Sequence, residues 1–205
     1  MGTVVVHLGM TGKWLFAQPG EVVVPHTHVR LWLDDEQELR YVDVRRFGWV
    51  AYHGDGAGPQ DAAHYGIDAL DPAFDEAHLA ALLSQSRAPL KAFLLDQTKV
   101  AGLGNIYACE ALWRARLSPR RLACNTPRSR VPLLRDAMVA VLQDSLAQGG
   151  TSFNDYVNSI GEPGEFIADL AVFQRAGAAC PRCGGVVRQF AQAGRSTFYC
   201  PGCQR

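Results

Sequence analysis

Two Cys-x2-Cys pairs, Cys180 with Cys183 and Cys200 with Cys203, stand near the end of the sequence with sixteen residues between them. Each pair can present two thiolates from one turn, and two pairs complete the tetrahedral four-thiolate site of a structural zinc ion. A segment this short has too little apolar surface to fold without such a staple. The sequence therefore predicts one structural zinc ion in a ribbon over residues 176–205.

Two disulfides would use the same four cysteines, and this is the alternative. The N-terminal residues MGTVVVHLGM contain neither the basic n-region nor the cleavage site of a secretory signal, so an oxidising compartment is not indicated. Metal binding is therefore favoured. Cys109 and Cys124 stand singly in the sequence and are expected to be buried or idle thiols.

Basic residues are concentrated in two blocks, although the formal net charge of the chain is zero. Residues 77–135 contain ten basic and two acidic residues, and residues 170–205 contain five arginines and no acidic residue. Such blocks can lie along a polyanion while the acidic remainder repels it, which favours a nucleic-acid ligand. Ordinary solvated helix faces would give the same pattern. No apolar run reaches the length of a membrane span, so no membrane partner is expected.

The periodicity of the chain changes from strand-like to helical near residue 75. Alternating apolar and polar residues predict strands at VVVHL, 29–33, 38–44 and 49–52, and a segment rich in Gly, Pro and Asp predicts a linker at 53–75. Helices are predicted at about 76–85, 89–96, 106–115 and 130–147, and a hairpin in the ribbon joins 186–190 to 196–199. The fold class is therefore expected to be α+β.

A glycine-rich turn, AGLGN at 101–105, separates the second and third predicted helices. Gly102 and Gly104 permit tight turns, and Asn105 is expected to cap the helix that begins near Ile106. Free backbone N–H groups at such a helix start can bind phosphate. Glycines that merely turn the chain are the simpler alternative.

Four motifs precede the ribbon in a fixed order, which is HLGMTGKW at 7–14, DVRRFG at 43–48, the stretch at 94–119 around GLGN, and GGTSFNDYVNSIGEPGEF at 149–166. With this order and with Arg195 at the tip of the ribbon hairpin, the chain resembles the formamidopyrimidine-DNA glycosylases of the endonuclease VIII superfamily over essentially its whole length. The resemblance implies part of an N-terminal β-sandwich in residues 1–70, a helix-two-turn-helix domain in 71–175 and a four-cysteine zinc finger in 176–205.

The resemblance also implies a function. Family members remove oxidised purines, such as 8-oxoguanine and formamidopyrimidines, from damaged double-stranded DNA in base-excision repair. They then cut the strand at the abasic site as lyases, by β,δ-elimination. A monomer is expected, located in a bacterial cytoplasm and associated with the nucleoid through DNA.

Particular positions match the family's functional residues. The resemblance assigns DNA contacts to His26, Arg45, Arg87, Asn105 and Arg195, and it assigns assistance to the elimination step to Arg195. Met10, Arg45 and Phe47 match the residues that fill the gap left by the everted nucleotide, a task suited to a flexible thioether, a guanidinium and a flat ring. The loop Ser152–Ile160 matches the segment that closes over the everted purine. The simpler alternatives are core packing for Met10 and Phe47, surface ion pairs for Arg45, the end of a turn for His26 and a solvated helix position for Arg87.

The sequence departs from the family pattern where it begins, at Met1-Gly2-Thr3. The family's N-terminal proline nucleophile, the adjacent glutamate and the hairpin lysine have no counterpart in it. An incomplete or wrongly started reading frame, a shortened damage-binding protein and a chain completed by a second polypeptide are the three explanations. The alternative function is therefore a non-catalytic protein that binds damaged or abasic DNA. A general zinc-ribbon nucleic-acid binder would leave HLGM, RRFG and GLGN unexplained.

Overall fold

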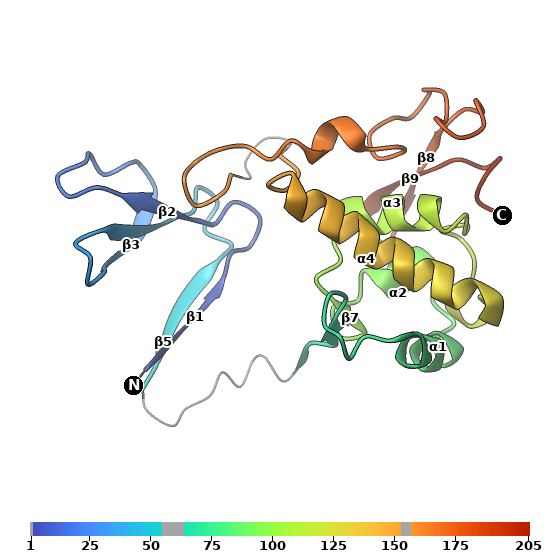
Figure 1. Ribbon diagram of the computed structural model, residues 1–205, viewed down its shortest axis with the longest axis horizontal. Coiled ribbons are helices and arrows are strands. Elements are labelled where there is room, and N and C mark those ends of the chain that lie inside the picture. Colours follow the sequence, from blue (N-terminus) through green and yellow to red (C-terminus); the bar gives the residue numbers. More distant parts are fainter. Residues whose placement is uncertain (1, 55–63, 153–156) are drawn as a thin grey trace. The chain divides into compact units, whose positions relative to one another are not determined.

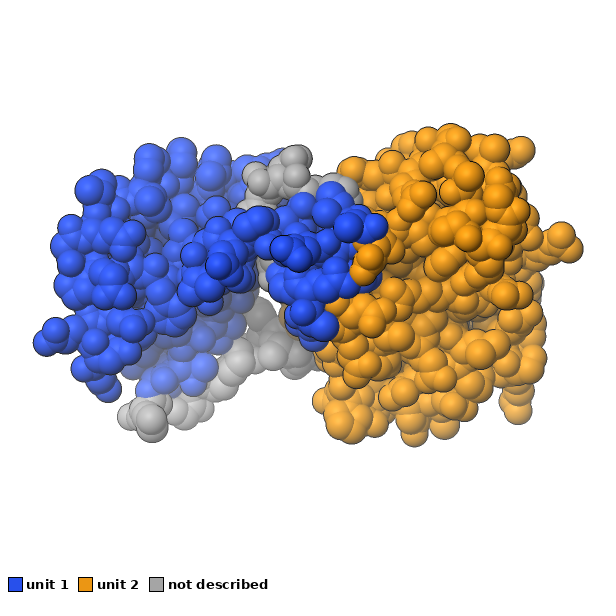
Figure 2. Space-filling view, turned by 45° about the horizontal axis from the view of Figure 1, so that its top comes forward, with its two compact units in different colours: residues 1–63, 145–168 blue, residues 64–144, 169–205 orange. Residues whose placement is uncertain are grey.

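The computed structural model describes residues 2–54, 64–152 and 157–205 (Figure 1). The chain divides into two compact units, which we call unit 1 (residues 1–63 and 145–168) and unit 2 (residues 64–144 and 169–205) (Figure 2). Unit 1 holds two antiparallel sheets, and unit 2 holds most of the helical residues and the four-cysteine ribbon. The predicted α+β class is confirmed. Within the described ranges, no helix is long and apolar enough to cross a membrane.

Five strands of unit 1 form its two sheets. Strand β1 (Thr3–His7) pairs with β5 (Trp49–His53), and β2 (Lys13–Ala17), β4 (Glu38–Val42) and β3 (Thr27–Trp32) form a three-stranded sheet in the order β2-β4-β3. The pattern predicted four of these strands and missed β2. This strand, KWLFA, follows directly on the turn at Gly12, and its four consecutive apolar residues do not alternate with polar ones.

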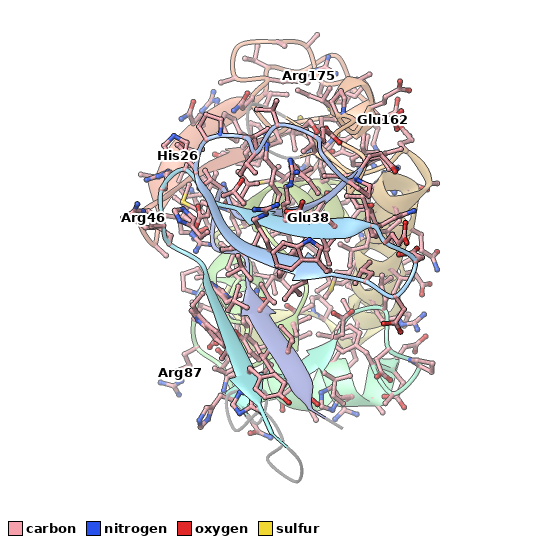
Figure 3. The ribbon with its side chains drawn as sticks, turned by 90° about the vertical axis from the view of Figure 1, so that its left-hand side faces the viewer. His26, Glu38, Arg46, Arg87, Glu162 and Arg175 are labelled. Atoms are coloured by element: carbon pink, nitrogen blue, oxygen red, sulfur yellow. The ribbon has the colours of Figure 1, made fainter. Side chains whose placement is uncertain are left out.

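The centre of unit 1 is ionic as well as apolar. Glu38 on β4 (labelled in Figure 3) is 3% exposed and accepts hydrogen bonds from Arg30 and from Arg40, which is 2% exposed. Arg40 also donates to the backbone carbonyls of Glu21 and Val22. The bonds from Arg30 and Arg40 lower the pKa of Glu38 to about 2 against the opposing effect of burial. The paired Glu38 carboxylate therefore links β4 to Arg30 on β3, and Arg40 links it to the segment at residues 21–22.

The four principal helices lie within about two residues of their predicted bounds. They are α1 (Glu76–Ser84), α2 (Leu90–Leu94), α3 (Asn105–Arg114) and α4 (Val131–Ala147); the 3-10 turns are Ala123–Asn125, Arg128–Arg130 and Phe166–Asp169. The Asp75 carboxylate caps α1 by accepting from the His78 N–H at 2.7 Å. A short parallel pair, β6 (Ile67–Asp68) with β7 (Val100–Ala101), was not predicted. Residues 55–63 of the predicted linker lie outside the described residues.

Helix α3 is the central element of unit 2. Ala108, Ala111 and Leu112 on α3 are completely buried, as are Leu90 on α2 and Leu134 on α4. The helix packs against α2 and against strand β9 (Arg195–Tyr199) of the ribbon. It therefore carries both its N-terminal glycine-rich turn and the ribbon on one rigid support.

The ribbon hairpin is confirmed, with its first strand two residues later than predicted. Strand β8 (Arg188–Gln192) pairs with β9 so that Gln192 lies opposite Arg195. The two-residue turn Ala193-Gly194 has φ values of 49° and 71°. Positive φ at both central positions is typical of a type I′ turn, which matches the twist of the strands. Arg195 is therefore the first residue after a tight, well-defined turn.

Candidate functional site

The four cysteines of the ribbon converge as the spacing predicts. The Sγ atoms of Cys180, Cys183, Cys200 and Cys203 all lie within 4.8 Å of one another. Two of the separations are 3.8 Å, between Cys180 and Cys203, and 3.5 Å, between Cys183 and Cys200. Four sulfurs at about 2.3 Å from one zinc ion would stand about 3.8 Å apart. The arrangement therefore fits one tetrahedral zinc ion.

Small residues and protonation energies both favour a metal at this position. A Cβ atom at Gly185 or Gly202 would lie 3.3 Å or 3.4 Å from Cys183 Sγ, so glycine keeps the space around the sulfurs open. Burial, followed by hydrogen bonding with the neighbouring cysteines, raises the pKa of Cys203 to about 12. Four thiolates at these distances repel one another, and a bound cation compensates their charge.

The ribbon is fixed to the end of α3 through Trp113 and Arg182. The Trp113 indole N–H donates to Cys180 Sγ over 3.4 Å, and the Arg182 guanidinium lies 4.0 Å from the centre of the Trp113 ring. Arg182 also donates to the Trp113 carbonyl at 2.7 Å. Although burial opposes the change, hydrogen bonds from Trp113 and from backbone N–H groups lower the pKa of Cys180 to about 6. These contacts therefore connect the metal centre directly to the C-terminal end of α3.

Asn105 does not cap α3, contrary to the prediction. Gly104 is the N-cap residue, and Asn105 is the first residue of the helix. Its side-chain nitrogen instead donates to the Ser196 carbonyl on β9 at 3.2 Å. Its Oδ1 atom is buried and has no hydrogen-bond partner within the described residues. The Asn105 side chain therefore bonds to β9 instead of capping its own helix.

Asn105 and Arg195 belong to one cluster, which is completed by Lys91. The Lys91 ammonium donates to the Ser196 carbonyl at 3.1 Å and to Thr197 Oγ1 at 2.8 Å, so Asn105 and Lys91 share one acceptor. Lys91 is completely buried, whereas Arg195 is exposed. Burial lowers the pKa of Lys91, and Arg195 lowers it further, while Cys109 opposes them. Sequence reasoning missed Lys91 because a single lysine in the segment LKAFL carries no recognisable signal.

The predicted gap-filling residues come together on two loops of unit 1. The Arg45 guanidinium lies 3.7 Å from Met10 Sδ, and its carbon atom lies 4.6 Å from the centre of the Phe47 ring. Met10 is 68% exposed and Phe47 is 56% exposed. Core packing, the simpler alternative for these two residues, is therefore wrong. Arg45 therefore contacts both an exposed thioether and an exposed ring, and apolar side chains of this kind can insert between stacked bases; we call these three residues the wedge.

A buried carboxylate, Asp43, holds both loops of this wedge. It accepts from the Thr11 hydroxyl and from the backbone N–H groups of Arg45 and Gly48, the last at 2.9 Å. Asp43 is 1% exposed. The bonds from Thr11 and Gly48 lower the pKa of Asp43 to about 2, so the carboxylate stays ionised far into the acid range. Sequence reasoning placed Asp43 in a motif but gave it no task, since its partner Thr11 is 32 residues away.

His26 and Arg87 occupy exposed turns, one in each unit. His26 has a φ of 65°, and its carbonyl accepts from the Asp43 N–H at 3.1 Å, which places it beside the loop that bears Arg45 and Arg46 (Figure 3). Arg87 lies between α1 and α2 and forms no ion pair within the described part of the chain (Figure 3). Both side chains are accessible to a large ligand.

Part of the predicted closing loop, residues 153–156 of Ser152–Ile160, lies outside the described residues. At the C-terminal end of this loop, the side-chain oxygen of Asn158 accepts hydrogen bonds from the N–H groups of Ile160 and Glu162. The Ser159 carbonyl accepts from the Phe16 N–H on β2 at 3.0 Å. The loop is therefore anchored to a sheet of its own unit.

Three family models match the chain in succession. They are the formamidopyrimidine-DNA glycosylase N-terminal domain over residues 1–50, the H2TH domain of the same enzymes over residues 65–157, and the zinc finger found in FPG and IleRS over residues 177–205. The last match and the geometry of the four cysteines agree on one structural zinc ion. Together the three models cover most of the sequence.

Curated relatives and solved structures agree with these models. The chain is 43% identical over its whole length to a formamidopyrimidine-DNA glycosylase of Bordetella petrii, of which it covers 76%, and 44% identical to one of Mycolicibacterium gilvum, of which it covers 73%. The crystal structure of MutM (Fpg) from Thermus thermophilus matches 99% of the chain, with a TM-score of 0.88 and 39% identity, and the chain covers 76% of it. Lactococcus lactis Fpg in complex with DNA that contains an abasic site matches 100% of the chain, with a TM-score of 0.86 and 32% identity over 75% of that protein. This chain belongs to the formamidopyrimidine-DNA glycosylase family.

Proposed function

We propose that this protein is a DNA glycosylase of base-excision repair that removes oxidised purines from damaged double-stranded DNA and cleaves the resulting abasic site as a lyase. The observation that carries the proposal is the agreement between family membership and two side-chain clusters, the exposed Met10–Arg45–Phe47 in unit 1 and, in unit 2, the half-buried Asn105 with the exposed Arg195. In this proposal the protein acts as a monomer in the bacterial cytoplasm, associated with the nucleoid through DNA.

The cluster in unit 2 is suited to the DNA backbone. An exposed guanidinium and a side-chain amide next to the free N–H groups of a helix start are donors that bind phosphate oxygens. Lys91 is too deeply buried to touch DNA, and its bonds to Ser196 and Thr197 fix the strand that carries Arg195. We assign phosphate contacts to Asn105 and Arg195, and assistance in strand elimination to Arg195.

The cluster in unit 1 is suited to the base stack. A base must leave the stack before its glycosidic bond is accessible, and the gap must then be filled. Met10 and Phe47 present apolar surface for this purpose, and Arg45 presents donors for the orphaned partner base. Asp43 fixes the loops that bear them, which limits the conformational entropy lost on insertion. His26 and Arg87 add exposed DNA contacts.

A second candidate function is binding of damaged or abasic DNA without base excision. It is favoured by the environment of the Lys91 amine in the unit 2 cluster, which is completely buried and hydrogen-bonded. Base excision with Schiff-base formation needs an unprotonated amine within bonding distance of the sugar. The two clusters supply hydrogen-bond donors for phosphate and apolar side chains for the base stack, which suffice for binding without base excision.

Borohydride trapping distinguishes the two candidate functions. The protein is incubated with a duplex that contains one 8-oxoguanine, with and without borohydride, and strand cleavage and the covalent adduct are measured on a denaturing gel. The proposed glycosylase gives cleavage and a trapped adduct with the 8-oxoguanine duplex and neither with an undamaged duplex. Absence of both products, with binding to an abasic duplex retained, would favour the non-catalytic function.

A further inference from the structure

A cavity of about 640 Å³ lies at the C-terminal end of α3, beside the metal centre. Its lining includes Cys183, Gly202 and Cys203 of the ribbon, together with Leu117 and Pro127. Five arginines also line it, namely Arg116, Arg121, Arg130, Arg182 and Arg205, and among the described residues no acidic side chain does. Three of them come from the basic block at 77–135 and two from the block at 170–205. Folding of unit 2 therefore joins the two basic blocks around one cavity, which we call the arginine pocket.

The arginines of the pocket are not all used by the protein itself. Arg182 donates to the Trp113 carbonyl, and Arg121 donates to the carbonyls of Asn125 and Arg205. The Nε atom of Arg121 is buried and has no partner among the described residues. In that same part of the chain, the side chains of Arg116 and Arg130 form neither a hydrogen bond nor an ion pair. Donors therefore remain available in the pocket.

The metal centre accounts for only part of this positive charge. A zinc ion with four thiolates carries a net negative charge, which neighbouring guanidinium groups help to balance. Arg182 already serves this purpose, since it stacks on the indole that donates to Cys180. Five guanidinium groups exceed the charge of such a centre, and a carboxylate at Arg205 would still leave a positive excess. The positive excess favours compensation by a bound anion.

We propose that the arginine pocket is an anion site that binds a phosphate or diphosphate group. Guanidinium groups present planar pairs of donors that match two phosphate oxygens, and they remain charged at every physiological pH. The volume is within the range of small-ligand sites, about 300–1,000 Å³. The pocket follows the end of α3, whereas Asn105 begins that helix, about 15 Å away along the axis. It is therefore a site separate from the Asn105–Arg195 cluster and independent of lesion recognition.

The phosphate group bound in the arginine pocket can come from two sources, a free diphosphate and the backbone of DNA beyond the lesion.

The test uses the zinc-loaded protein and a double variant, Arg116→Gln with Arg130→Gln. Arg128→Gln with Arg188→Gln is the matched control, because it removes the same charge from exposed arginines outside the pocket. Zinc content and circular dichroism establish that both variants are folded. Binding of inorganic pyrophosphate is measured by calorimetry, and binding to duplexes of about 12 and about 30 base pairs is measured across a salt series.

If the natural ligand is a free diphosphate, pyrophosphate binds the wild type and the control, and it binds the pocket variant at least about tenfold more weakly. The slope of log K for DNA against log salt concentration is then the same in all three proteins. If the ligand is the DNA backbone, the slope of log K against log salt concentration for the longer duplex is smaller in magnitude by about 1–2 in the pocket variant than in the control. Each arginine that is replaced removes one phosphate contact. If the pocket variant and the control are equal in both measurements, the pocket is not an anion site and the proposal is wrong.

Discussion

Removal of zinc is expected to unfold the ribbon over residues 180–203. The binding free energy of structural zinc in zinc-finger peptides is about 10–16 kcal/mol, and a segment this small has little else to hold it. Cys200→Ser should have the same effect, since Cys200 is completely buried in the metal centre. Cys124→Ser is the matched control, because Cys124 is half-buried and lies outside the four-sulfur cluster. Zinc content and amide hydrogen exchange of β8 and β9 measure the outcome.

The expected pattern is loss of zinc and of amide protection in Cys200→Ser, and retention of both in Cys124→Ser. Affinity for DNA should fall together with the fold of the ribbon, because Arg195 is held on β9. Amide protection that survives chelation of the metal would contradict the assignment of a structural zinc site.

Replacement of Glu110 by alanine is expected to destabilise unit 2 by at least about 3 kcal/mol. Glu110 on α3 is 2% exposed, and its carboxylate accepts from the backbone N–H groups of Ala171, Val172 and Phe173 at 2.8–2.9 Å. Alanine would leave three buried donors without acceptors, and each costs about 1–3 kcal/mol. Urea unfolding monitored by the helical circular dichroism signal, which comes mainly from unit 2, measures the change in the free energy of unfolding.

Glu110→Gln is the informative companion variant. One oxygen of the carboxylate accepts from Val172 and Phe173, so a glutamine carbonyl can keep these two bonds. Its amide group would then face the Ala171 N–H, and only that bond would be lost. The glutamine variant should therefore be clearly more stable than the alanine variant. Equal and small losses of unfolding free energy in both variants would show that the bonds to residues 171–173 do not hold the segment that leads into the ribbon.

The sequence predicted those features that depend on local pattern. Helical periodicity located α1 to α4, and the cysteine spacing predicted a metal centre whose four sulfurs the structure brings together. The two basic blocks were visible as charge, and the structure joins them at the arginine pocket. Local pattern suffices in these cases because each signal is repeated within one element or one short motif.

Features that depend on distant partners were not predictable in the same way. Asn105 had the residue type and position of a helix cap, but its pairing with Ser196, 91 residues away, decided its orientation. Lys91 bonds to Thr197 across 106 residues, and Glu110 bonds to backbone groups more than 60 residues away. Nothing near these residues in the sequence identifies their partners. The buried polar groups that position the candidate sites are therefore the part that only the structure supplies.

Selective binding of damaged DNA tests the central claim most directly. The affinity of the zinc-loaded protein is measured at one fixed salt concentration for a duplex with a single abasic-site analogue and for the same duplex without damage. We expect the damaged duplex to bind at least about tenfold more tightly, and Asn105→Ala or Arg195→Ala to reduce that affinity by about 1–3 kcal/mol. Asn125→Ala and Arg188→Ala, the matched controls, should leave it nearly unchanged. Equal affinity of the wild type for both duplexes would contradict the account.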